Sequence, residues 1–157
     1  MYTKINEKDS AMKLGAIYSK EKTTFTLFSP VADSVFVIFY DKGNDSAETG
    51  RLEMVRGEGE LRSIFSATAE GNLDGVYYTY EVHTSDGTFS SHDPYARACG
   101  VNGHRSMVID LSKTDPDGFA DEDRPKLADP MSMIITEVSV ADVSAGASAH
   151  SRYPGTF

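Results

Sequence analysis

The sequence has 157 residues, which suits one domain or one domain with an appendage. Hydrophobic residues make up 39% and charged residues 25%, a balance that supports a packed core and argues against a disordered chain. The formal net charge of −9 argues against binding to nucleic acid or to an anionic membrane surface, because both need basic residues to meet phosphate groups. A neutral ligand such as a sugar is not disfavoured.

Features that the sequence lacks bear on the cellular location of the protein. No apolar run approaches the roughly 18 residues of a membrane span, and the first residues have no apolar centre typical of a signal peptide. We expect a cytoplasmic location, with an exported protein that has lost its signal as the alternative. Cys99 is the single cysteine and excludes an intramolecular disulfide; its neighbours Ala98 and Gly100 predict a buried, inert thiol.

The predicted elements are almost all strands. After a polar lead-in over residues 1–13, apolar residues alternate with polar ones, or form short apolar runs, over residues 24–28, 34–40, 51–55, 64–69, 76–82, 89–91 and 107–111. Tyr78 and Tyr80 share the predicted core face of the fifth of these runs, whereas Tyr77 points to its other side. The Asp86-Gly87 pair predicts a tight hairpin. Seven or eight such strands without a helical period predict an all-β, two-layer antiparallel sandwich.

The character of the chain changes near residue 112. Residues 112–130 carry three prolines and are rich in acidic residues, which predicts a linker. Residues 133–140 then form one strand-like run without a partner in the chain. The acidic residues from Asp115 to Asp123 do not match a calcium-binding loop, because positions five and six from Asp115 are Phe119 and Ala120. We predict neither a metal site nor a cofactor.

Four stretches carry a resemblance to a known family. They are residues 14–25, Phe-Ser-Pro at 28–30, Asp-Gly-Val-Tyr-Tyr-Thr-Tyr at 74–80, and the segment from Asp-Pro-Tyr-Ala-Arg-Ala at 93–98 to residue 111. Together they resemble the N-terminal family 48 carbohydrate-binding module, and the start of the catalytic region, of type I pullulanases in glycoside hydrolase family 13. The resemblance implies an immunoglobulin-like sandwich of the early set type over residues 14–111, the linker over 112–130, and the start or a remnant of a barrel domain over 131–157.

The chain departs from the family pattern in two places. Thr136, Ser139 and Ala141 stand where the family usually has Tyr, His and Arg, so we expect a truncated or degenerate member. The chain has no Trp, and Phe28 and Phe65 stand where members commonly have one. The family's catalytic carboxylates lie downstream of this sequence and cannot be assigned to it. Asp93, which precedes a proline, is predicted to cap a turn with its own side chain.

The resemblance implies a non-catalytic accessory domain that supports a catalytic barrel and contacts α-glucan. A free-standing glucan-binding or regulatory module and a degenerate remnant without a ligand are the alternatives. The candidate carbohydrate contacts are Tyr77, Tyr95 and Arg97, although Tyr95 and Arg97 would also suit packing against a neighbouring domain. Phe36, Ile38 and Tyr40 alternate with the predicted core face, so we expect them to form an apolar interface for the barrel or for a second copy in a homodimer.

Overall fold

Antiparallel strands dominate the computed structural model, which describes residues 13–123, 126 and 128–155. The strands within this described part are β1 (Gly15–Tyr18), β2 (Lys22–Phe28), β3 (Ser34–Tyr40), β4 (Glu48–Arg56), β5 (Ile64–Glu70), β6 (Tyr77–Thr84), β7 (Gly87–Ser91), β8 (Ala98–Cys99) and β9 (Ser106–Met107). The chain divides into two compact units, one that ends at Pro116 and one that begins at Asp117. All nine strands belong to the first unit.

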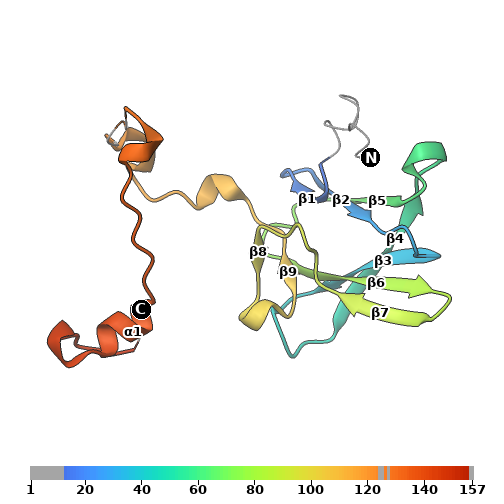
Figure 1. The fold of residues 1–157 in the computed structure, drawn as a ribbon. Helices are drawn as coiled ribbons and strands as arrows, with labels where there is room; N and C mark the ends of the chain where they lie inside the picture. The colour runs from blue at the N-terminus through green and yellow to red at the C-terminus, as the bar shows by residue number, and fades with distance from the viewer. Residues whose placement is uncertain (1–12, 124–125, 127, 156–157) are drawn as a thin grey trace. The chain divides into compact units, whose positions relative to one another are not determined.

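One curled sheet with two packed halves forms the first unit (Figure 1). Its strand order is β1-β2-β5-β4-β3-β6-β9-β8, with β7 paired to β6 beside β9. β4 pairs with β3 over most of its length and then with β5 at its end, where Val55 lies opposite Ser66. Because this strand takes part in both halves, the sheet bends around it and its inner faces meet. The predicted antiparallel sandwich is confirmed.

The core lies between the two halves, filled by side chains that alternate along the strands. Its largest fully buried members are Phe25, Val35, Val37, Phe65, Tyr78 and Tyr80. Phe25 packs edge-on against Tyr78, with ring centroids 5.0 Å apart. Burial of each large apolar side chain contributes about 1.5–3 kcal/mol. The prediction that Tyr78 and Tyr80 face the core is therefore correct.

The structure tests the predicted hairpin at Asp86-Gly87 and the predicted burial of Cys99. Thr84 lies opposite Gly87, so Ser85 and Asp86 form a two-residue turn and the predicted hairpin is confirmed. The prediction for Cys99 is wrong, because its side chain is exposed. It lies in β8, a two-residue strand at the end of the sheet order, and apolar neighbours in sequence do not provide a covering layer there.

The second unit contains short helical turns at Phe119–Asp121, Pro130–Ser132 and Ala147–Ala149 and one α-helix, α1 (Val140–Ala145). The strand predicted over residues 133–140 does not form in the described part of this unit. Residues 133–139 have no strand partner within the described ranges, Ile134 is 94% exposed, and Val140 begins α1 instead. An extended run without a neighbour cannot make the ladder hydrogen bonds that define a strand. Ser139 caps the helix by accepting a hydrogen bond from the Asp142 amide. No helix among the described residues is long and apolar enough to cross a membrane.

Candidate functional site

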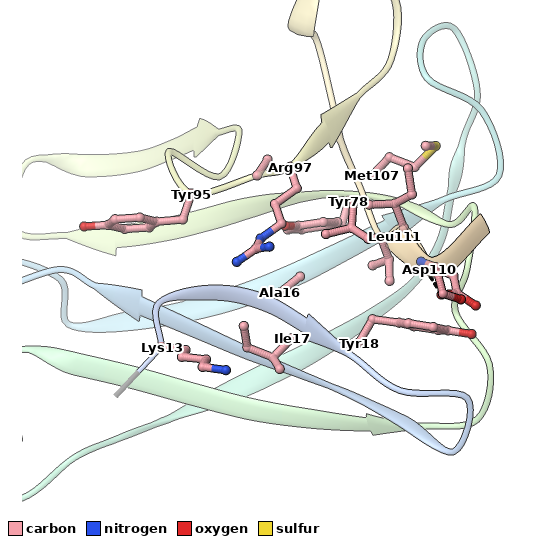
Figure 2. A pocket seen from close by; sticks show the side chains of 14 residues that line it. Lys13, Ala16, Ile17, Tyr18, Tyr78, Tyr95, Arg97, Met107, Asp110 and Leu111 are labelled. Atoms are coloured by element: carbon pink, nitrogen blue, oxygen red, sulfur yellow. Dashed lines mark hydrogen bonds between the residues drawn. The ribbon is translucent and has the colours of Figure 1, made fainter. Parts of the chain in front are cut away.

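A pocket of about 300 Å³ opens beside β1 in the first unit. One wall comes from Ala16, Ile17 and Tyr18 on β1, and the facing wall comes from residues 107–112 and residues 95–97. Figure 2 shows Arg97 reaching toward Ala16 and Ile17, while Tyr18 and Asp110 lie together at the opposite end. The structure therefore places two of the predicted carbohydrate contacts, Tyr95 and Arg97, on one hollow.

A turn built on Asp93 holds Tyr95 and Arg97 at the pocket. Asp93 is only 2% exposed, and its Oδ1 accepts a hydrogen bond of 2.8 Å from the Tyr95 amide. Its Oδ2 accepts hydrogen bonds from the hydroxyls of Tyr78, at 2.7 Å, and Tyr80, at 3.3 Å. The prediction that Asp93 caps a turn is confirmed, and the structure adds that this cap is anchored in the core.

The tyrosine hydroxyls of this anchor stay protonated over the ordinary pH range. Burial raises the pKa of both Tyr78 and Tyr80, and the adjacent Asp93 carboxylate raises it further. Both hydroxyls therefore keep the protons that they donate to Asp93. The anchor gives the Tyr95 segment a fixed backbone position.

The close approach of β1 and the Tyr95 segment requires a glycine. Gly15 has φ of +90°, and a Cβ at this position would lie 2.9 Å from the Cβ of Tyr95. Residues with a side chain rarely adopt this φ, and the space for one is already filled. Gly15 thus lets the two pocket walls meet at this end.

Hydrogen bonds fix the opposite end of the pocket. The Asp110 Oδ1 accepts from the Ser112 amide at 3.1 Å and from the Ser112 hydroxyl at 2.6 Å. The Asp110 amide donates to Asp74 Oδ1 at 2.8 Å, and the Lys113 ammonium lies 2.6 Å from Asp74 Oδ2. The Ser112 hydrogen bond lowers the pKa of the Asp110 carboxyl, and the Lys113 hydrogen bond lowers that of Asp74. Both carboxylates are therefore favoured in their charged form.

Tyr77 lies away from this pocket, on the outer face of the sheet. It lies opposite Tyr40 on β3, so the structure groups it with the predicted interface residues and separates it from Tyr95 and Arg97. The loop at Gly43 packs against its ring, since a Cβ on Gly43 would lie 3.1 Å from Tyr77 Cε1, and a second loop, at Gly100, packs against Gly43. One side of the ring is therefore already in contact with the protein.

The three predicted interface residues share this outer face, but polar side chains cover much of it. Ile38 is only 3% exposed. The Arg105 guanidinium stacks 3.5 Å from the centroid of the Tyr40 ring, and that of Arg51 lies 5.6 Å from the centroid of Phe36. The face does not present a continuous apolar surface, and an interface or homodimer through it stays a prediction.

Sequence reasoning missed the β1 side of the pocket. Ile17 and Tyr18 entered the sequence analysis only within the stretch of residues 14–25 that carries the family resemblance, and no local pattern could show that residues 107–112 face them. Their proximity depends on contacts across the whole unit; the Tyr18 hydroxyl, for example, donates to Asn72, 54 positions away. Among the described residues, no group of three or more His, Cys, Asp or Glu is placed to hold a metal ion.

Comparison with known proteins agrees with the resemblance of the sequence. The model of the family described as carbohydrate-binding module 48 (isoamylase N-terminal domain) matches residues 13–96. Pullulanase A of Streptococcus pneumoniae serotype 4 is 31% identical over 116 residues, which cover 69% of this chain and 9% of that protein. Pullulanase of Bacillus subtilis is 30% identical over 98 residues, which cover 62% of this chain and 13% of that protein.

Solved structures of pullulanases contain a region with the same fold as this chain. A pullulanase from Paenibacillus barengoltzii, crystallised with maltohexaose and alpha-cyclodextrin, matches with a TM-score of 0.77 and 33% identity over 86% of this chain and 20% of its own. The pullulanase from Bacillus acidopullulyticus matches with a TM-score of 0.76 and 35% identity over 86% of this chain and 16% of its own. The chain thus spans about a tenth to a fifth of these relatives.

Proposed function

Since the chain belongs to the carbohydrate-binding module 48 family, we propose that it binds α-glucan through the pocket beside Tyr95 and Arg97. It is an accessory carbohydrate-binding domain of the pullulanase type. The observation that carries the proposal is the pocket itself, which brings the Arg97 guanidinium beside apolar side chains, with the Tyr95 ring at its outer edge (Figure 2).

The chemistry of the pocket suits a pyranose ring. The CH groups of a sugar pack on a flat aromatic face, and its hydroxyls need hydrogen-bond partners at the rim. Tyr95 is 45% exposed and can supply a flat face at the outer edge of the hollow, while the apolar surfaces of Ile17 and Leu111 line the hollow itself. Arg97 can donate to the sugar hydroxyls, and Asp110 can accept from them.

The role within a larger protein is also part of the proposal. The relatives are pullulanases, and one solved neighbour was crystallised with maltohexaose, which supports an α-glucan as the ligand class. We propose that the domain supports a catalytic barrel and that residues 131–157 correspond to the start of that further domain. Tyr77, partly covered by the loop at Gly43, is a weaker candidate contact than Tyr95.

Titration of the full chain with maltohexaose tests the binding proposal, together with affinity electrophoresis in amylopectin gels. Tyr95→Ala should weaken binding about fivefold, because the ring stacks on the sugar, and Arg97→Ala should weaken it similarly through lost hydrogen bonds. Tyr153→Ala and Arg62→Ala are the matched controls at exposed positions outside the pocket. Unchanged mobility of the wild-type chain in the gels, with no maltohexaose binding, would refute the proposal.

A further inference from the structure

We propose that Lys113 is a positioning residue for this pocket, and that occupancy of the pocket and docking of the exit segment, residues 107–114, stabilise each other. The inference rests on the proposed function, because it concerns the same pocket. It adds a link between ligand binding and the part of the chain that leads out of the first unit.

The two walls of the pocket are not joined to each other by a strand ladder. Among the described strands, β1 pairs with β2 alone, and β9 ends at Met107. Past Met107, two backbone hydrogen bonds connect the exit segment to the turn before β6: the Val108 amide donates to Val76 O at 3.0 Å, and the Gly75 amide donates to Val108 O at 2.9 Å. The wall formed by residues 109–112 therefore depends on side-chain contacts for its position.

Asp74 provides those contacts with both of its oxygens. Its Oδ1 accepts the hydrogen bond from the Asp110 amide, and its Oδ2 lies 2.6 Å from the ammonium of Lys113. Asp110 and Lys113 flank Leu111 and Ser112, which line the pocket. One carboxylate thus fixes both ends of this part of the wall.

The same network continues to the β1 wall. The Asn72 Oδ1 accepts hydrogen bonds from the Asp74 amide, at 3.1 Å, and from the Tyr18 hydroxyl, at 2.9 Å. A continuous series of contacts therefore runs from Tyr18 through Asn72 and Asp74 to Lys113. It ties the facing walls together at the Asp110 end of the pocket.

The Lys113 end of this series is the part most readily broken. The Lys113 side chain is 59% exposed and that of Asp74 is 22% exposed, and such ion pairs contribute little to global stability. Loss of the pair would loosen the Lys113 end of the exit segment without unfolding the sandwich, because Val108 stays buried in the core and the Asp110 amide keeps its hydrogen bond to Asp74. A ligand that touches both walls binds only the docked arrangement well, so each process must favour the other to the same extent.

The test combines affinity with hydrogen exchange on the full chain, with maltohexaose as the probe. We expect Lys113→Ala to weaken maltohexaose binding by about two- to fivefold, while Lys113→Arg, which restores a cation for Asp74, stays close to wild type. Lys42→Ala is the matched control, since this exposed lysine lies outside the pocket. Maltohexaose should slow exchange of the Val108, Lys113 and Thr114 amides in the wild type and less so in Lys113→Ala.

The outcomes separate the two proposals. If the wild type binds maltohexaose but Lys113→Ala binds it equally well, or the exchange of these three amides does not respond to the sugar, the inference is overturned and the proposed function stands. If the wild type does not bind, both are overturned. The thermal midpoint of Lys113→Ala should match that of the wild type; a large decrease would mean that Lys113 acts through global stability, which also overturns a positioning role.

Discussion

Replacement of Tyr78 by Phe removes one oxygen atom from the best-buried polar contact in the sandwich. The Tyr78 hydroxyl donates to Asp93 Oδ2 at 2.7 Å, and neither side chain is more than 2% exposed. Hydrogen bonds to a charged group contribute about 1.5–3 kcal/mol to stability, so we expect Tyr78→Phe to lower the free energy of unfolding by about 2 kcal/mol. For a unit of this size, the thermal midpoint should decrease by about 10 °C.

Two other tyrosines, Tyr80 and Tyr40, provide comparisons for the predicted loss of stability in Tyr78→Phe. The Tyr80 hydroxyl reaches the same oxygen at 3.3 Å, so Tyr80→Phe should cost about 1 kcal/mol. The Tyr40 hydroxyl lies 3.3 Å from Thr79 Oγ1 in a half-buried contact, and Tyr40→Phe should cost less than either. Urea unfolding of the full chain, followed by circular dichroism, measures all three variants.

A double-mutant cycle tests whether Asp93 is the cause. In an Asp93→Asn background, the cost of Tyr78→Phe should decrease, because the charged acceptor has already been removed. Equal costs for Tyr78→Phe and Tyr40→Phe, or a cost of Tyr78→Phe that Asp93→Asn leaves unchanged, would refute the reasoning that the Asp93 anchor stabilises the Tyr95 turn.

Two further predictions concern loop packing and acid stability. Gly100→Ala would place a Cβ 2.5 Å from the Cα of Gly43, and because backbone cannot yield as a flexible side chain can, we expect a loss of about 1–3 kcal/mol in urea unfolding; an unshifted midpoint would contradict this. The lowered pKa of the Asp74 and Asp110 carboxyls means that their contribution to stability is complete above the unfolded value of about 4 and is lost as pH falls through the lower folded values. Stability should therefore decrease by a small amount below about pH 4, and by less in Asp74→Asn, chiefly through the Asp110 amide bond to Asp74 and the Ser112 bonds to Asp110; identical acid sensitivity of the two proteins would count against the assignment.

The interior of the fold could be predicted because strand periodicity is a local property. The alternation in residues 76–82 correctly assigned Tyr78 and Tyr80 to the core, and the Asp-Gly pair located the hairpin, since both depend on neighbours within a few positions. The same alternation could not reveal that Arg105 crosses from a distant turn to cover Tyr40, with its guanidinium donating to Lys42 O, 63 positions away. Outward-facing residues therefore looked more exposed in the sequence than they are.

The candidate site was only half predictable for a similar reason. The Asp93–Arg97 segment stood out by its motif, and the cap by Asp93 follows from its side chain alone. No local pattern assigns a site role to Tyr18, which lines the pocket, or to Lys113, which holds Asp74 behind it, because both positions arise from folding of the whole unit. Cys99 shows the opposite error, because apolar neighbours in the sequence predicted a burial that requires a covering layer. Residues 133–140 were expected to lack a partner strand, and without one the strand-like pattern does not produce a strand.

The dual pairing of β4 has a consequence for how the sandwich comes apart. Because one continuous strand supplies neighbours to both β3 and β5, neither half can detach without breaking a ladder that the other half shares. Opening of one layer therefore also disturbs the other layer through β4. The two layers should unfold as one cooperative unit, so that amides at their centres have the same free energy of opening in hydrogen exchange.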